Sequence, residues 1–196
     1  MISKLAKSIA HFFVVQNITE ESKEVIYAYG MELLISDVLN TIIVLLIALF
    51  SHTLPAVVVF IAVFMGLRQF VGGFHANSHL SCMFTLVMVM MVFSYGICNV
   101  SGHITPIFSI SFIMIALPII LCIAPVPHPN KPMSEEKSVK LRKRSCILAV
   151  TLSVVTIALL VFQYQKLSLY VSSGMLLSAI MALLGHFLNR GGNSKR

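Results

Sequence analysis

A short polar stretch between two apolar runs contains the residues most able to do chemistry. Cys82 supplies a thiol, and His75 lies seven residues before it as a candidate base, preceded by Arg68 and by Gly72 and Gly73. An imidazole that accepts the thiol proton produces the thiolate, which is the reactive nucleophile. Ionisable groups beside membrane-like segments are costly to keep, so this stretch indicates a catalytic site.

The separation of His75 from Cys82 predicts a break in the backbone. In a straight helix, seven residues share a face but lie about 10 Å apart along the axis at 1.5 Å per residue, which is long for a direct contact. We therefore expect the Gly72–His75 segment to leave the helical path and fold back toward the thiol. Glycines make such a turn inexpensive.

His79 opens two alternatives to this interpretation. It lies one turn before Cys82 and is the easier partner by distance. The three residues His75, His79 and Cys82 also have the spacing i, i+4, i+7 that could present zinc ligands from one helix. We identify no fourth ligand nearby, so the sequence favours no metal and no cofactor. A polar loop with inert side chains beside the lipid headgroups is the remaining alternative.

Two acids lie in the first long apolar segment and could support the site. Glu32 is near its beginning, and Asp37 follows about 7.5 Å deeper at 1.5 Å per residue. We expect Glu32 to orient the imidazole of His75. Asp37 could pair with Arg68 or pack as a neutral acid between helices.

The composition places these residues in a membrane protein. Of 196 residues, 58% are hydrophobic and 11% are charged, whereas soluble domains carry about 25% charged residues. The net charge of +7 is explained by membrane orientation, so we expect no nucleic-acid partner. The four cysteines form no CxxC pair, which argues against a disulfide framework.

The hydrophobic pattern predicts an all-α fold, a polytopic bundle of about six transmembrane helices in a single domain over 1–196. Residues 1–24 form an arm with an amphipathic interfacial helix over 2–16. The bundle covers 31–188, and 127–145 forms a basic loop. The six expected spans are 31–50, 54–71, 83–100, 106–126, 146–163 and 168–188.

The distribution of basic residues predicts the orientation. With both termini in the cytoplasm, all 14 Lys and Arg residues except Lys166 lie on the cytoplasmic side, as the positive-inside rule requires. We therefore expect a multi-pass protein of the cell membrane with Cys82 at the cytoplasmic face. The reducing cytosol would keep that thiol free.

A second motif follows the fourth expected span. Prolines alternate with other residues from Pro125 to Pro132, which favours a stiff extended segment. A basic cluster follows, and it could contact anionic lipid or dock the acidic tail of a peptide. The cluster consists of Lys140, Arg142, Lys143 and Arg144.

Together, the two motifs resemble the accessory gene regulator B (AgrB) family. The resemblance rests on the order Arg68-x3-Gly-Gly-Phe-His75-Ala-x5-Cys82 and on Ala124-Pro-Val-x-His-Pro-Asn-Lys-Pro with Glu135-Glu136 after it. It covers nearly the whole chain. It implies a bacterial membrane cysteine endopeptidase that processes the short precursor of a quorum-sensing peptide, an amphipathic AgrD-like propeptide.

The resemblance also implies roles for individual residues. The cysteine matching Cys82 attacks the precursor near its C-terminal side, and the histidine matching His75 acts as the base. Release of an acidic tail leaves a thioester, which a cysteine or serine of the precursor attacks to close a thiolactone or lactone ring. Arg68, Gly72 and Gly73 match positions needed for activity. No catalytic role for His79 is carried over, and both a monomer and a homodimer remain open.

A small ion or metal transporter is the alternative function. His75, His79, Cys82, Glu32 and Asp37 would then line an ion path. That hypothesis explains acids within an apolar segment, but it does not explain the proline-rich motif.

Overall fold

The chain is described by a computed structural model that covers residues 2–72, 79–126 and 135–193, with the backbone alone at residues 33, 37, 79–83, 137 and 188–193. Every element in these ranges is helical apart from a single backbone bridge. The elements are α1 (Ile2–Val15), η1 (Glu21–Lys23), α2 (Glu24–Phe50), α3 (Leu54–Val71), α4 (His79–Met91), η2 (Val92–Gly96), η3 (Ile97–Asn99), α5 (Thr105–Ile123), α6 (Glu135–Val161) and α7 (Gln165–Asn193).

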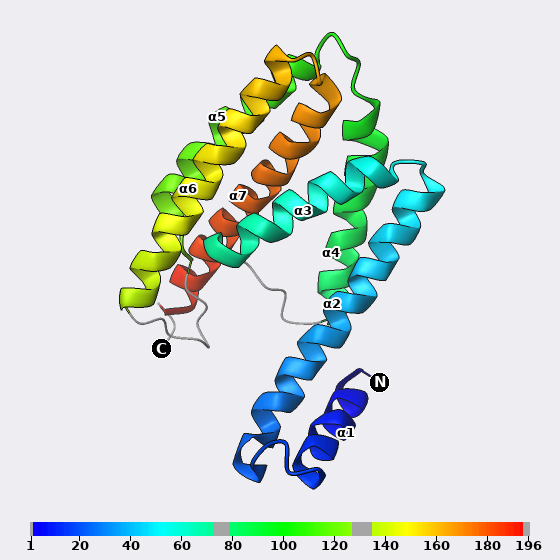
Figure 1. The fold of residues 1–196 in the computed structure, drawn as a ribbon, viewed down its shortest axis with the longest axis vertical. Coiled ribbons are helices and arrows are strands. Elements are labelled where there is room, and N and C mark those ends of the chain that lie inside the picture. Colours follow the sequence, from blue (N-terminus) through cyan, green and yellow to red (C-terminus); the bar gives the residue numbers. More distant parts are fainter. Residues whose placement is uncertain (1, 73–78, 127–134, 194–196) are drawn as a thin grey trace.

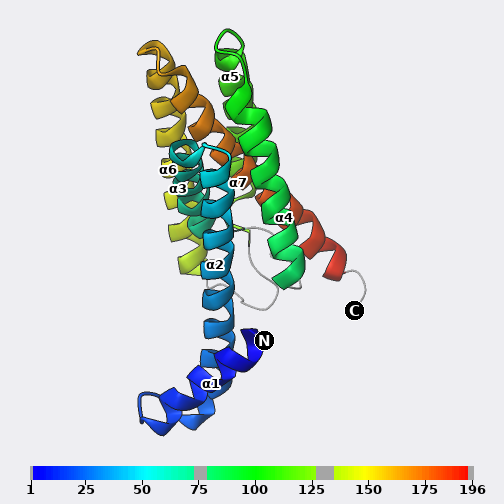
Figure 2. The same cartoon turned by 90° about the vertical axis from the view of Figure 1, so that its right-hand side faces the viewer.

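The long helices form two groups that α3 connects (Figure 1). α5, α6 and α7 lie side by side on one flank, and α2 and α4 lie together on the other. α3 crosses obliquely between the groups and packs on α7 and α6 as well as on α2. Viewed from the side, α1 and the beginning of α2 extend past the ends of the other helices (Figure 2).

Five of the described helices are long and apolar enough to cross a membrane. They correspond to five of the six expected spans, and the prediction of an all-α polytopic membrane protein is confirmed. The span expected at 83–100 corresponds to α4, η2 and η3, whose apolar part, Phe84–Asn99, is shorter than the other five. A π-helical turn interrupts it at Val92–Gly96.

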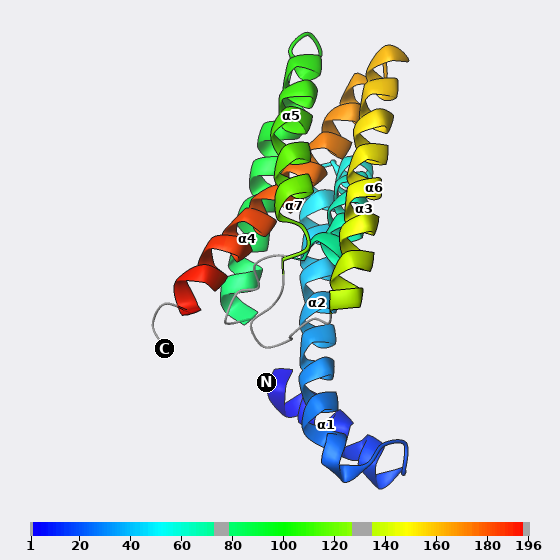
Figure 3. The same ribbon diagram turned by 90° about the vertical axis from the view of Figure 1, so that its left-hand side faces the viewer.

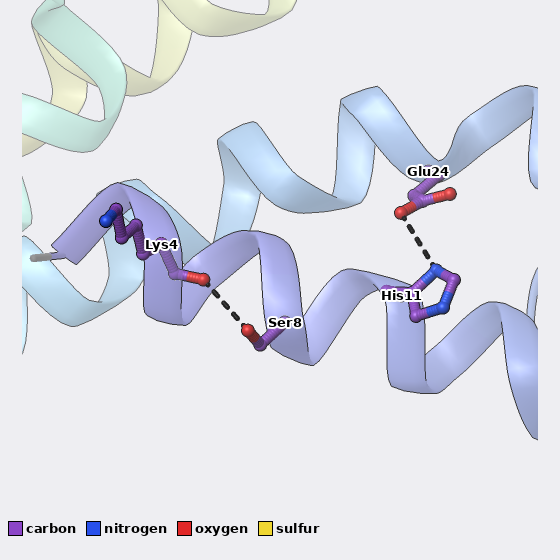
Figure 4. A network of polar contacts seen from close by, with 4 residues as sticks. All are labelled: Lys4, Ser8, His11 and Glu24. Carbon is purple, nitrogen blue, oxygen red and sulfur yellow. Dashed lines mark hydrogen bonds and ion pairs between the residues drawn. The ribbon is translucent and has the colours of Figure 1, made fainter.

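The amphipathic helix expected in the N-terminal arm is α1, which folds back along the beginning of α2. Its small residues Ala6 and Ala10 are fully buried, which allows the two helices to approach closely. His11 Nδ1 lies 3.4 Å from Glu24 Oε1 across the pair, and within α1 the Ser8 hydroxyl donates to Lys4 O (Figure 4).

Two helix boundaries differ from the expected ones. α2 begins at Glu24 rather than near residue 31, because α1 packs against its first turns. α6 begins at Glu135, so residues 135–145 are helical although we expected them in a basic loop. Glu135 and Glu136 in the first turn favour this start, since acidic side chains stabilise the positive end of the helix dipole.

Two apolar clusters hold the bundle together, and α3 contributes to both. The α7 cluster contains the end of α3, and the α4 cluster contains its beginning and middle. The α7 cluster comprises Leu67, Val71, Ala116, Ile120, Ala124, Val126, Ala149, Met175, Ala179 and Ala182. The α4 cluster comprises Val44, Ala48, Ala56, Val57, Phe60, Met90 and Phe93.

Candidate active site

Arg68 lies in the last turn of α3, where its guanidinium carbon sits 5.4 Å from the centroid of the Phe64 ring. The side chain is partly buried. A guanidinium over an aromatic face gains roughly 0.5–2 kcal/mol, depending on how far it is removed from water. This contact helps fix the direction of the Arg68 side chain one turn before the glycine pair.

Gly72 ends α3 with a backbone conformation that suits glycine alone. Its φ is 72° and its ψ is −154°, a combination that side chains exclude. Its N–H donates to Arg68 O at 3.0 Å, which closes the last turn of the helix. The expected departure from helical geometry therefore begins at Gly72, whereas the expected fold-back of His75 lies outside the described residues.

The second motif is in direct contact with Gly72. The N–H of Val126 donates to Val71 O at 2.9 Å, and Gly72 and Val126 form a parallel backbone bridge. A Cβ atom on Gly72 would lie 2.5 Å from Val126 O, closer than real contacts allow. The two motifs, more than 50 residues apart in the sequence, thus meet at one backbone pair.

Cys82 lies in the first turn of α4, as the fourth residue of that helix. The positive end of a helix dipole favours negative charge near this turn, which suits a thiolate. Gly73 and His75 lie outside the described residues, and at His79 and Cys82 the backbone alone is described. The distance from the imidazole to the thiol therefore stays a prediction.

Glu32 lies in the first half of α2, and its side chain is partly buried. α2 packs against α4 and runs in the same direction (Figure 3), and Val44, Ala48, Met90 and Phe93 belong to the same α4 cluster. The role of Glu32 in orienting His75 stays a prediction. Asp37 lies in α2, and its side chain lies outside the described part.

The basic cluster lies in the first turns of α6, with all four side chains exposed. Lys140 pairs with Glu136 one turn earlier, an arrangement that stabilises an exposed helix by a few tenths of a kcal/mol. The cluster therefore stands on a rigid helix that follows the proline-rich motif. It comprises Lys140, Arg142, Lys143 and Arg144.

Among the described side chains, no group of three His, Cys, Asp or Glu residues could hold a metal ion. The zinc alternative rests on His75, His79 and Cys82, which lie outside that search. Cys98, Cys122 and Cys146 are free thiols. No described pair of cysteines is therefore cross-linked.

Helices of this length and composition define a polytopic membrane protein, in which Gly72 and Val126 bring the two motifs into contact. The profile of the accessory gene regulator B family matches residues 3–182, so the chain belongs to that family. An AgrB-like protein of Clostridium beijerinckii is 25% identical over 145 residues, which cover 72% of this chain and 71% of that protein. No solved structure matches the chain.

Two features near these residues were not predicted from the sequence. The pairing of Val126 with Gly72 leaves no local signal in the sequence. Ser36 and Asn40 are buried on the face of α2 that also carries Glu32. Their spacing of four residues, in phase with Glu32, was the available signal, because it places polar side chains on one helix face.

Proposed function

We propose that the chain is a membrane-embedded cysteine endopeptidase that cleaves a short quorum-sensing propeptide and promotes closure of a thiolactone or lactone ring. Membership of the AgrB family carries this proposal, together with both motifs of the resemblance. The pairing of Gly72 with Val126 supports it, since it gives the two motifs a common location.

In the proposed mechanism, His75 accepts the proton of the Cys82 thiol, and the thiolate attacks the carbonyl carbon of the scissile peptide bond. The tetrahedral intermediate collapses as the imidazolium returns the proton to the departing amine, which leaves with the acidic tail. A thioester between Cys82 and the rest of the propeptide remains. The thiol or hydroxyl of a residue within the propeptide then attacks that thioester, which closes the ring and regenerates the Cys82 thiol.

The negative oxygen of the tetrahedral intermediate requires hydrogen-bond donors. Arg68 and the backbone N–H groups of Gly72 and Gly73 are the candidates. Since the N–H of Gly72 already donates to Arg68 O at 3.0 Å, we favour Arg68 or Gly73. Glu32 orients the His75 imidazole in this proposal.

The proposed location is the cytoplasmic end of the bundle, where the basic residues gather. An amphipathic propeptide on the inner leaflet would reach the beginning of α4 from there. The basic cluster of α6 would hold the acidic tail, and the apolar surroundings would keep water from the thioester until the ring closes.

Substitution of the two catalytic residues tests the proposal. The protein and an amphipathic propeptide with an internal Cys or Ser and an acidic C-terminus would be reconstituted in vesicles, and the released tail would be measured by mass spectrometry. We expect Cys82→Ala and His75→Ala to abolish release with normal membrane insertion, and Cys82→Ser to retain a trace of activity. Normal cleavage by either alanine variant would refute the assignment.

Treatment with a chelator distinguishes the peptidase hypothesis from the metal-transporter hypothesis. Cleavage by the purified protein should be unchanged after treatment with EDTA, because no step of the proposed mechanism needs a metal. One equivalent of bound zinc that is lost in His79→Ala would favour the transporter instead.

A further inference from the structure

A line of polar side chains follows one face of α2 and continues into its apolar contact with α4. Ser36 and Asn40 are 7% and 8% exposed, and partly buried Glu32 lies one turn before them. Val44 and Ala48 continue the same spacing of four residues into the α4 cluster. We refer to Glu32, Ser36 and Asn40 as the polar seam.

The seam is confined to the side of α2 that faces the bundle. Leu34, Val38 and Ile42, on other sides of the helix, are 55%, 51% and 48% exposed. An apolar exposed surface and a buried polar face are what a membrane helix presents when its polar residues serve the interior. A buried amide or hydroxyl costs about 1–3 kcal/mol unless it is hydrogen-bonded, and both Ser36 and Asn40 have a partner within the protein.

The register between α2 and α4 places the seam beside the beginning of α4. Val44 and Met90 share the α4 cluster. Ser36 lies eight residues before Val44, and Cys82 lies eight residues before Met90. In parallel helices both steps descend about 12 Å. Since the cluster spans about one turn of each helix, the first turns of α4 lie at about the level of Ser36 and Asn40. The beginning of α4 lies beside the middle of α2 in both side views (Figures 2 and 3).

We propose that Ser36 and Asn40 bind the backbone of the propeptide just upstream of the scissile bond, between α2 and the first turns of α4. This inference rests on the proposed function and adds a substrate-binding wall to it. An extended peptide at this depth needs partners for its N–H and C=O groups, since lipid supplies none. The Asn40 amide offers both a donor and an acceptor to one peptide unit, and the Ser36 hydroxyl offers either.

The seam lies on the α2 side of Cys82, whereas Gly72 and Val126 belong to the end of α3 and the α7 cluster. The substrate would therefore lie between two walls, with its acidic tail toward the basic cluster and its upstream residues along α2. Neither Ser36 nor Asn40 is without a partner in the structure. Peptide binding would thus exchange contacts within the protein for contacts with the substrate.

Photocrosslinking tests the location without relying on catalysis. A propeptide with a diazirine-bearing leucine two to four residues before the scissile bond would be bound to the Cys82→Ala protein in vesicles and irradiated. We expect adducts on α2 between residues 32 and 41. Adducts on α5, α6 or α7 with none on α2 would overturn the inference, while inactivity of Cys82→Ala would still support the proposed function.

Kinetics test the role of Asn40. We expect Asn40→Leu to raise the KM for the propeptide about tenfold, as loss of one hydrogen bond implies, with kcat changed less than threefold. Asn40→Gln should restore part of the affinity because it keeps the amide. The matched control is Thr41→Leu, since Thr41 is the next residue and is exposed. Equal KM values for Asn40→Leu and Thr41→Leu would reject substrate binding by the seam.

Discussion

Gly72 combines a backbone conformation that favours glycine with a backbone contact to Val126, which lies far away in the sequence. Its positive φ excludes most side chains, and Val126 O occupies the space that a Cβ would need. We expect Gly72→Ala to reduce propeptide cleavage at least tenfold, because strain of about 1–3 kcal/mol and the clash must displace either the proline-rich motif or the path toward His75. The rate of tail release from vesicles measures this effect.

Gly66→Ala is the matched control for Gly72→Ala. Gly66 lies in the same helix, and nothing surrounds the position of its Cβ within 4 Å. Alanine there should leave cleavage unchanged and stabilise the helix by about 0.5–1 kcal/mol. If both variants cleave at the wild-type rate, the contact between Gly72 and Val126 does not position the site.

At the scale of elements, the basic cluster lies on the first turns of α6, so a helix holds its charged side chains in fixed positions. Lys143 and Arg144 are exposed beside the pair formed by Lys140 and Glu136. We expect Lys143→Glu with Arg144→Glu to raise the KM for an acid-tailed propeptide roughly tenfold, since each exposed charge contributes up to about 1 kcal/mol. The effect should shrink with added salt because screening weakens exposed charge pairs.

The control for this reversal is on α1, where Lys4 and Lys7 are also exposed. Lys4→Glu with Lys7→Glu changes the net charge equally but lies on the hairpin of α1 and α2. Both double variants would be compared on propeptides with acidic and with neutralised tails. An unchanged KM for the α6 variant would leave the contact with anionic lipid as the explanation of the cluster.

At the scale of the whole molecule, α3 crosses α7 closely and contributes residues to both apolar clusters, so this crossing holds the two groups of helices together. A Cβ on Gly174 would lie 2.9 Å from Phe60 O and 3.0 Å from Val63, so the helices meet backbone to backbone there. Close approach at small residues is how membrane helices gain packing energy. Nearby, the hydroxyls of Ser109 and Ser168 join α5 to α7 at 3.1 Å.

We expect Gly174→Ala to force α3 away from α7 and to lower stability by about 1–3 kcal/mol, the usual effect of overpacking. Thermal unfolding of the detergent-solubilised protein should shift downward by several degrees. Gly30→Ala, at a position with open space, should not lower the midpoint. Equal midpoints for the two variants would show that the crossing tolerates a wider separation.

The sequence by itself determined the class of protein, most of its helices and the two motifs. These properties follow from composition and from periodicity along the chain, which are local. It also predicted the break at Gly72, because glycine pairs permit turns that other residues resist. It placed residues 135–145 in a loop because charged residues dominate there, although Glu135 and Glu136 at the helix start were the contrary signal.

Only the tertiary structure decided which of these local features meet. The pairing of Gly72 with Val126 depends on the oblique path of α3 and on where α5 ends. The level of Ser36 and Asn40 beside the beginning of α4 depends on the register between α2 and α4, which Val44, Ala48, Met90 and Phe93 set by packing. Tilt and register arise from the fit of side chains between helices, and no pattern along a single helix contains that information.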